Sequence, residues 1–521
     1  MSNIKKRNLP LFLLILDGWG IWKEKKGNAI ALAKTPVING LYKKYPHTLL
    51  QASAKFVGLP SGQPGNSEAG HMNIGAGRVV EQDAVIISKS INNGTFFKNP
   101  AFLQAARHAS DNNSNIHLMG LLSDGSSPHS DIDHLLSLIT FFTSRTKQKI
   151  YLHLFTDGRD SPPFAALKIL SQYKSVFNSN RVSVATIMGR FYAMDRKKSW
   201  ARTKQAFGAL VMGKGYLIKS ATEAVERAYN RGESDEFIKP SVVVHKNKKP
   251  VGAVQSNDTM VFFNLRSDRA RQLTKVFAQN DFTKKNKGAF SLGRKITNLL
   301  FVALTDFGPD LEGVLTAYPG MDVSDTLPIA LRGLRQCYIA ETEKYAHVTY
   351  FLNGGYDHPV ANEDWVNIPS KDVDSYADQP EMSTNELTKR VLGDLKDNPY
   401  DFVLMNFAAP DMVGHTGNLK AGIKAVEIVD KAVGQIIEAV LAKKGTIIIT
   451  ADHGNIEEMI NLSTDEIDTE HSINPVPFIV INHRSYKLKK NGKLSNIAPT
   501  ILDIFGIQKP KLMNEKSLIV K

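Results

Sequence analysis

The feature that most constrains the fold of this chain is a recurring short apolar run that stops abruptly near Asp, Gly or Asn. Nearly continuous runs of Val, Ile and Leu predict strands buried on both faces, as in parallel sheets covered by helices. Segments with helical spacing lie between them, such as residues 421–441. The pattern therefore predicts an α/β fold. The runs are Leu11–Leu16, Ile116–Leu122, Ile150–Phe155, Val182–Met188, Met260–Leu265, Phe402–Phe407 and Thr446–Thr450.

A chain of 521 residues is too long for one ordinary core, so at least two domains are expected. Candidate linkers lie at residues 81–83 and 317–320. A glycine-rich serine motif precedes the first linker, whereas the richest Asp and His clusters follow the second. If these groups share one site, residues 83–315 form a domain inserted into a discontinuous domain of residues 1–82 and 316–521.

Composition and charge narrow the function classes. The single cysteine, Cys337, excludes an intramolecular disulfide and fits the cytoplasm. The apolar run from Leu9 to Leu16 is too short to span a membrane, and Asp17 interrupts it, so neither a signal peptide nor a membrane segment is expected. The net charge of +14 suits nucleic acid, an acidic surface or an anionic small substrate. Because its basic patches lack interleaved aromatic residues, nucleic-acid binding is not expected.

The candidate nucleophile is Ser67, in the segment Gln63–His71, where glycines and a proline permit a sharp turn. A free hydroxyl is a poor nucleophile near neutral pH and needs a base or a metal ion to lose its proton. On its own, the segment is equally typical of a surface turn. The remaining motifs decide between the two interpretations.

Four Asp and His elements, most of them at the end of an apolar run, predict a site for two metal ions. Any one alone is typical of a capping aspartate or a buried histidine. Carboxylates combined with imidazoles favour Mn²⁺ or Zn²⁺ over Mg²⁺ or Ca²⁺. One of the ions, placed on the Ser67 oxygen, would lower the pKa of the hydroxyl. The elements are Asp17, the pair Asp411 and His415 at helical spacing, the pair Asp452 and His453, and His471.

The middle of the chain carries arginines just past strand ends, where open α/β sheets bind their ligands. Guanidinium groups match phosphate and carboxylate groups bidentately, although salt bridges to nearby aspartates explain any one arginine equally well. His129 is a candidate acid–base group or phosphate donor, and Lys344 is a candidate phosphoryl contact. The arginines are Arg159, Arg190, Arg196, Arg266 and Arg269.

Seven motifs in this order closely resemble the cofactor-independent (2,3-bisphosphoglycerate-independent) phosphoglycerate mutase family, over about residues 9–506. They are Leu-Asp-Gly-Trp-Gly at 16–20, Gly-Asn-Ser-Glu-Ala-Gly-His at 65–71, Asp-Gly-Arg-Asp-Ser-Pro-Pro at 157–163, Gly-Arg-Phe-Tyr-Ala-Met-Asp-Arg at 189–196, Phe-Asn-Leu-Arg-Ser-Asp-Arg-Ala-Arg-Gln at 263–272, Ala-Glu-Thr-Glu-Lys-Tyr-Ala-His-Val-Thr at 340–349 and Thr-Ala-Asp-His-Gly-Asn at 450–455.

The resemblance implies an alkaline phosphatase-like metal-binding domain split by an inserted phosphotransferase domain. It implies interconversion of 3-phosphoglycerate and 2-phosphoglycerate in glycolysis and gluconeogenesis, through a phosphoserine at Ser67, in a cytoplasmic monomer. One Mn²⁺ would be held by Asp17, Ser67, Asp452 and His453, and the other by Asp411, His415 and His471. Substrate contacts would come from His129, Arg159, Asp160, Arg190, Arg196, Arg266, Arg269 and Lys344. We expect Asp160 to be the base that takes a proton from the attacking substrate hydroxyl.

The chain departs from the family pattern in two places. Ala69 stands where the family usually has Val. More important, residues 125–131 read Gly-Ser-Ser-Pro-His-Ser-Asp where the family typically reads Gly-Gly-Val-His-Ser-His, so one extra residue precedes His129. A metal-dependent phosphatase, another phosphomutase and a non-catalytic basic binding protein remain the alternatives.

Overall fold

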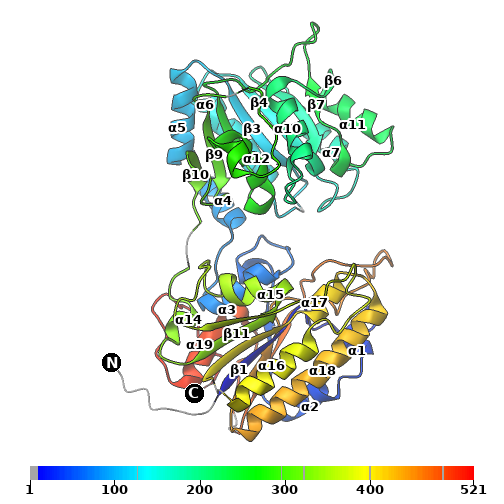
Figure 1. The fold of residues 1–521 in the computed structure, drawn as a ribbon, viewed down its shortest axis with the longest axis vertical. Helices are drawn as coiled ribbons and strands as arrows, with labels where there is room; N and C mark the ends of the chain where they lie inside the picture. The colour runs from blue at the N-terminus through cyan, green and yellow to red at the C-terminus, as the bar shows by residue number, and fades with distance from the viewer. Residues whose placement is uncertain are drawn as a thin grey trace. The chain divides into compact units, whose positions relative to one another are not determined.

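The computed structural model describes residues 10–520, apart from residues 126, 295, 321–322, 398–399 and 484–485. The chain forms two compact units, each with its own sheet and core (Figure 1). Unit 1 comprises residues 1–82 and 321–521, and unit 2 comprises residues 83–320. We expected the second division after residue 315. That position falls inside strand β10 (Val314–Tyr318), which pairs with β9 (Leu300–Thr305) and therefore keeps its residues in unit 2.

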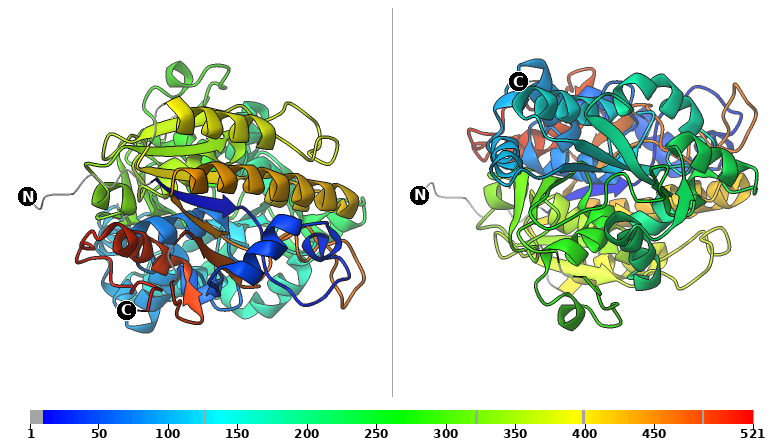
Figure 2. Two further views of the ribbon diagram at one scale, coloured as in Figure 1. Left: turned by 90° about the horizontal axis from the view of Figure 1, so that it is seen from below. Right: turned by 90° about the horizontal axis from the view of Figure 1, so that it is seen from above.

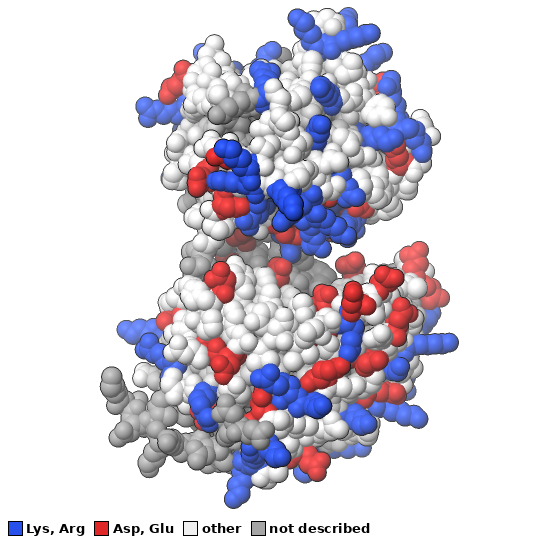
Figure 3. Space-filling model, in the orientation of Figure 1, with Lys and Arg blue, Asp and Glu red and all other residues white. Residues whose placement is uncertain are grey.

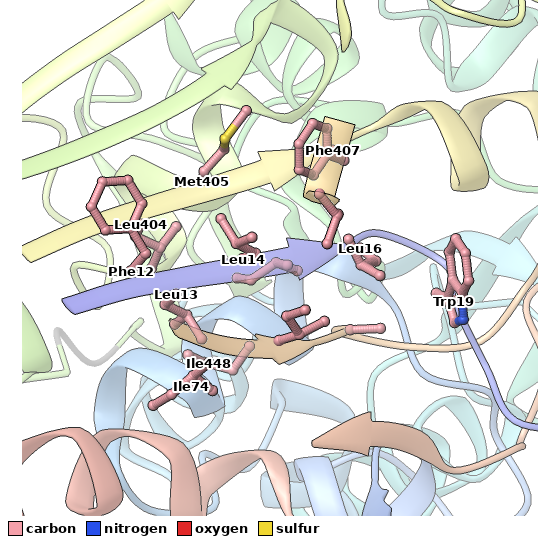
Figure 4. Packing of buried hydrophobic residues seen from close by; sticks show 14 of the residues in the cluster. Phe12, Leu13, Leu14, Leu16, Trp19, Ile74, Leu404, Met405, Phe407 and Ile448 are labelled. Carbon is pink, nitrogen blue, oxygen red and sulfur yellow. The ribbon is translucent and has the colours of Figure 1, made fainter. Parts of the chain in front are cut away.

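Unit 1 is built on an eight-stranded sheet with β1 at its centre. β1 pairs in parallel with β13 and β14, and all six residues of both β1 and β13 are buried. Figure 4 shows how the side chains of these strands pack. In spatial order the strands are β12 (Asp364–Ile368), β11 (Gln336–Glu341), β13 (Phe402–Phe407), β1 (Leu11–Leu16), β14 (Thr446–Thr450), β15 (Val476–Ile481), β2 (His47–Gln51) and β16 (Gly492–Lys493).

Helices cover both faces of this sheet. The long helix α18 (Leu419–Ala442) packs against α16 (Thr384–Asp397), α2 (Pro36–Lys44) and α1 (Ala29–Leu32) on one face (Figure 2). Helix α3 (Ser67–Ala76) packs against α19 (Ile497–Phe505) on the other. Because parallel strands end at one edge of the sheet, this arrangement gathers the residues that follow β1, β13 and β14.

Unit 2 has a second eight-stranded sheet with a separate hydrophobic core on each face. Within β3, Leu118 and Leu122 pack in one core and Met119 and Leu121 in the other, so the strand is buried on both sides. In spatial order the strands are β10, β9, β8 (Thr259–Phe262), β3 (Ile116–Leu122), β4 (Ile150–Thr156), β5 (Val182–Gly189), β7 (Ser241–Val243) and β6 (Tyr216–Ile218).

The helices of unit 2 lie on both faces of its sheet. One core contains apolar side chains of α5 (Pro100–Asp111), α6 (Ile132–Arg145), α7 (Ala166–Gln172) and α11 (Ala221–Tyr229). The other contains side chains of α10 (Trp200–Met212) and α12 (Ser267–Ala278). The predicted α/β class is confirmed in both units. No helix in the described part of the chain is long and apolar enough to cross a membrane.

Candidate metal centre and anion site

Ser67 is the first residue of helix α3, directly after the capping residue Asn66, whose side chain accepts a hydrogen bond from the Ala69 amide. The helix packs closely against the loop after β14: a Cβ atom on Gly70 would lie 2.7 Å from the carbonyl oxygen of Asp452. Glycine at this position therefore lets the serine helix approach that loop. Ser67 is 5% exposed, so its setting is a buried site and not the surface turn considered above.

The Ser67 hydroxyl is surrounded by polar groups from distant parts of the chain. Its Oγ atom lies 2.9 Å from His453 Nε2 and 2.8 Å from Lys344 Nζ. It donates a longer hydrogen bond of 3.4 Å to Asp17 Oδ1. The structure thus brings together the serine, the first strand end and the Asp452–His453 turn, as predicted from their positions past strand ends.

Two buried carboxylates contact one lysine in this site, and a third buried carboxylate belongs to the same site. Lys344 Nζ lies 2.7 Å from Asp17 Oδ1 and 2.5 Å from Asp411 Oδ2, and the carboxylate of Asp452 is also fully buried. Burial, together with repulsion from Asp452, raises the pKa of Asp17 to about 7. One lysine ammonium group cannot balance the negative charge of three buried carboxylates. A divalent cation would supply the missing positive charge.

Two imidazoles meet beside Asp411. His415 and His471 place their Nε2 atoms 3.1 Å apart, and these atoms lie 3.4 Å and 3.3 Å from Asp411 Oδ1. Their Nδ1 atoms contact the carbonyl oxygens of Thr469 and Gly65, both at 2.8 Å. Because a carbonyl only accepts hydrogen bonds, each Nδ1 carries a proton. In its neutral form each ring therefore presents the Nε2 lone pair beside Asp411, as a metal ligand does. Burial opposes protonation of His415, but its hydrogen bond to Asp411 raises the pKa of this ring.

A second ligand set lies next to the first. The ligand atoms of Asp17, Asp411 and His453 lie within 4.8 Å of one another, as do those of Asp411, His415 and His471. Asp452 Oδ2 is buried and lies 3.3 Å from His71 Nδ1 and 3.5 Å from His453 Nε2, both longer than an ordinary hydrogen bond. The positions of all seven predicted ligand residues therefore allow two neighbouring cation sites beside Asp411.

Sequence reasoning missed three residues around this centre. His71 and Asn406 are fully buried, and the Asn406 amide donates a 2.6 Å hydrogen bond to Asp17 Oδ2. Glu457 is also fully buried and accepts hydrogen bonds from the Gly20 and Asn455 amides, each at 2.9 Å, and from Ser472. His71 closes the serine motif and Asn406 interrupts an apolar strand, so both carried a local signal. Glu457 carried none.

Apart from Lys344, which lies in unit 1, the predicted substrate residues follow β3, β4, β5 and β8 of unit 2. Arg190 is buried and its Nη1 atom bonds Asp157 at 2.6 Å and Asp160 at 2.5 Å. His129 Nε2 lies 3.8 Å from Asp160 Oδ2. Burial, then the charges of Arg190 and Arg266, lower the pKa of His129 to about 3, with a partial offset from Asp268. His129 is therefore a neutral imidazole at neutral pH.

Three of the other predicted arginines surround the carboxylate of Asp268. Arg196, Arg266 and Arg269 lie 3.3, 3.5 and 3.9 Å from Asp268, while Arg159 is half-exposed and lies 3.7 Å from Glu236. The expected salt bridges thus exist, but one aspartate cannot neutralise three guanidinium groups. Burial, then Arg196 and Arg190, lower the pKa of Arg269, which reflects this crowding of positive charge.

The net positive charge of the chain comes entirely from unit 2. This unit has 33 Lys and Arg residues against 19 Asp and Glu residues, whereas unit 1 has 32 of each, which accounts for the net charge of +14. Figure 3 shows Lys and Arg side chains gathered on unit 2 and mixed charges on unit 1. An excess confined to the unit with the arginine cluster favours a small anionic ligand over a nucleic acid spread along the whole chain.

Comparisons with known proteins agree with this chemistry. A family model described as the metalloenzyme superfamily matches residues 9–509. A 2,3-bisphosphoglycerate-independent phosphoglycerate mutase of Clostridium novyi (strain NT) is 47% identical over 514 residues, which cover 98% of this chain and 99% of the relative. A mutase of Methanosarcina barkeri (strain Fusaro / DSM 804) with the same name, numbered 1, is 46% identical over 525 residues and covers all of both chains.

A solved structure extends the likeness to three dimensions. The crystal structure of Leishmania mexicana phosphoglycerate mutase at low cobalt concentration aligns with a TM-score of 0.78 and 28% identity, covering 99% of this chain and 98% of that one. The superfamily match supports the use of divalent metal ions at the centre in unit 1. The family resemblance and the fold class that the sequence motifs predicted are both confirmed, and the chain belongs to the 2,3-bisphosphoglycerate-independent phosphoglycerate mutase family of the metalloenzyme superfamily.

Proposed function

We propose that this protein interconverts 3-phosphoglycerate and 2-phosphoglycerate, without 2,3-bisphosphoglycerate, through a phosphoserine formed on Ser67. The observation that carries the proposal is the buried Ser67 hydroxyl, held within 3 Å of both His453 and Lys344. A hydroxyl in this setting can be deprotonated and aimed at a phosphorus atom. Family membership supplies the substrate class.

The proposed cofactors are two divalent ions, preferentially Mn²⁺, which suits a mixture of carboxylate and imidazole ligands. The first would be held by Asp17, Ser67, Asp452 and His453, and the second by Asp411, His415 and His471. When bound, the ions supply positive charge that lowers the pKa of the serine hydroxyl and stabilises the transferring phosphoryl group.

The chain's own residues perform the remaining steps. The Ser67 hydroxyl gives up its proton to solvent and its Oγ attacks phosphorus. The bond from phosphorus to the glycerate oxygen breaks as Asp160 relays a proton from solvent to that oxygen. Lys344 stabilises negative charge on the phosphoryl oxygens, since phosphoryl transfer depends mainly on positioning and electrostatics. The arginines retain glycerate while it turns, and Asp160 then takes the proton of the other hydroxyl as the phosphoryl group returns.

In this scheme unit 1 is the metal-binding, phosphatase-like domain and carries the phosphoryl group. Unit 2 is the inserted phosphotransferase domain and binds the glycerate through His129, Arg159, Arg190, Arg196, Arg266 and Arg269. The excess positive charge of unit 2 favours capture of a small, highly charged anion. We further propose a monomer that acts in the cytoplasm and binds neither nucleic acid nor membrane.

A coupled assay for 2-phosphoglycerate tests the proposal. The full chain with Mn²⁺, 3-phosphoglycerate and no bisphosphoglycerate should produce 2-phosphoglycerate, and Ser67→Ala should abolish production while metal binding persists. Release of inorganic phosphate without 2-phosphoglycerate would instead identify a phosphatase. Salt-dependent retention on nucleic acid with no metal uptake would identify a basic binding protein.

A further inference from the structure

The loop that carries the extra residue before His129 makes a hydrogen bond to the proposed base. The Ser127 hydroxyl donates a 3.0 Å hydrogen bond to Asp160 Oδ2 and accepts a 3.3 Å hydrogen bond from the His129 amide. Ser127 is only 5% exposed, so water competes little for this contact. The serine that the family motif lacks therefore contacts a residue that the proposed reaction uses.

Hydrogen bonds within the protein hold the backbone groups of Gly125, Ser127 and His129 without any substrate. The Ser123 hydroxyl accepts hydrogen bonds from the Gly125 and Ser127 amides, at 3.1 and 3.3 Å. The Leu265 amide donates a 2.8 Å hydrogen bond to the His129 carbonyl and so ties His129 to the residues after β8. The amide of Ser127 is therefore held while its hydroxyl contacts Asp160.

The two oxygens of Asp160 have different surroundings. Oδ2 accepts hydrogen bonds from Ser127 and Arg190 and is the oxygen nearest to His129. Among the described residues, Oδ1 accepts no hydrogen bond. Burial alone would raise the pKa of Asp160, but its hydrogen bond to Arg190, the charge of Arg190 and its hydrogen bond to Ser127 together lower the pKa, which keeps the carboxylate ionised.

We propose that Ser127 is a positioning residue that holds Asp160 Oδ2, so that Oδ1 is the oxygen that exchanges a proton with the glycerate hydroxyl. The inference rests on the proposed function. As the phosphoryl group returns to glycerate, the bond from phosphorus to Ser67 breaks and the bond to the glycerate oxygen forms. The hydroxyl proton passes to Oδ1 of Asp160, whose orientation the Ser127 hydrogen bond preserves.

A matched pair of variants isolates the hydroxyl. Ser127→Thr keeps it, whereas Ser127→Val replaces it with a methyl group of similar size, so any crowding is common to both. We expect the kcat of Ser127→Val to fall about tenfold below that of Ser127→Thr, the effect of losing one hydrogen bond to a charged acceptor, with KM changed less than about twofold. Loop disorder would instead raise KM, because Arg190 and His129 belong to the binding site.

Ser130 provides the control, because its buried hydroxyl has no hydrogen-bond partner among the described residues. Ser130→Thr and Ser130→Val should therefore have the same kcat as each other. Equal kcat for the two Ser127 variants, or a difference confined to KM, would overturn the inference, as would full activity of Asp160→Asn. A wild-type protein that forms no 2-phosphoglycerate would refute the proposed function itself, which separates the two failures.

Discussion

Glu457 holds three loops of the metal centre together, and its replacement should weaken metal binding. Oε2 accepts the amides of Gly20 and Asn455, whereas Oε1 accepts the Ser472 hydroxyl and the Asn474 side chain. These donors lie within three residues of Asp17, His453 and His471. The carboxylate therefore fixes the backbone of ligand-bearing loops that are far apart in the sequence.

The size of the effect follows from the four hydrogen bonds. Glu457→Gln keeps one acceptor oxygen and replaces the other with an NH₂ group. If the NH₂ group takes the place of Oε1, it faces the Ser472 hydroxyl and the Asn474 amide nitrogen, and the hydroxyl can rotate to accept a hydrogen bond from it. Hydrogen bonds to a charged acceptor contribute about 1.5–3 kcal/mol each, compared with about 1 kcal/mol for neutral pairs, so a net loss of about 2–4 kcal/mol is expected. If the whole loss acted on metal affinity, binding would weaken by about 30–900-fold. Because part of the loss destabilises the fold instead, we expect roughly 10–100-fold weaker metal binding, typical of outer-shell partners.

Chelator competition with Mn²⁺ measures this affinity directly. The neighbouring Glu458 is a matched control, since it is partly exposed and its side chain accepts only one hydrogen bond from a described residue, at 3.0 Å from the Asn474 amide. Glu458→Gln should weaken binding less than about threefold. Wild-type affinity in Glu457→Gln, or an equal loss in both variants, would refute the idea that this carboxylate organises the centre.

Three further predictions concern other parts of the fold. Lys344→Met should lower kcat about 10²–10³-fold while Mn²⁺ remains bound, because it removes a donor aimed at the reacting oxygen; unchanged turnover would contradict this. Burial and the charge of His117 hold the pKa of His153 well below 6.5, so the fold favours the neutral ring. Since the unfolded chain binds a proton near pH 6.5, His153 should cost about 1.4 kcal/mol of stability per pH unit below that value, and urea unfolding of His153→Gln should show a shallower acid slope than wild type. Leu404→Ala, in the buried strand β13, should destabilise unit 1 by about 2–5 kcal/mol in denaturant titrations, and a loss below about 1 kcal/mol would show that the site collapses around the cavity.

Much of the fold was predictable because a strand buried on both faces has a nearly continuous apolar sequence. The predicted run at 402–407 coincides with β13, and the predicted helix at 421–441 lies inside α18. The run predicted at 260–265 begins and ends too late, since β8 comprises Thr259–Phe262. Apolar character continues past the end of that strand because Phe263 and Leu265 remain buried in the adjoining core, and hydrophobicity alone cannot mark where pairing stops.

The metal centre was predictable to the extent that its ligands follow strand ends. Glu457 was missed for a physical reason: its hydrogen bonds join groups that are distant in sequence, and it belongs to no motif that the sequence analysis identified. The extra residue before His129 was visible in the sequence, but its contact with Asp160 depends on how two loops of unit 2 meet. Such a contact can be identified only from the three-dimensional structure.

In the proposed reaction Ser67 carries the phosphoryl group during turnover. Rapid acid quenching of the Mn²⁺-loaded protein with 3-phosphoglycerate, followed by mass spectrometry of the peptide that contains residues 63–71, measures this directly. We expect a phosphate on Ser67 that forms and disappears fast enough to support turnover, and no phosphate on any residue in Ser67→Ala. Continued formation of 2-phosphoglycerate by Ser67→Ala, or a label on a different residue, would contradict it.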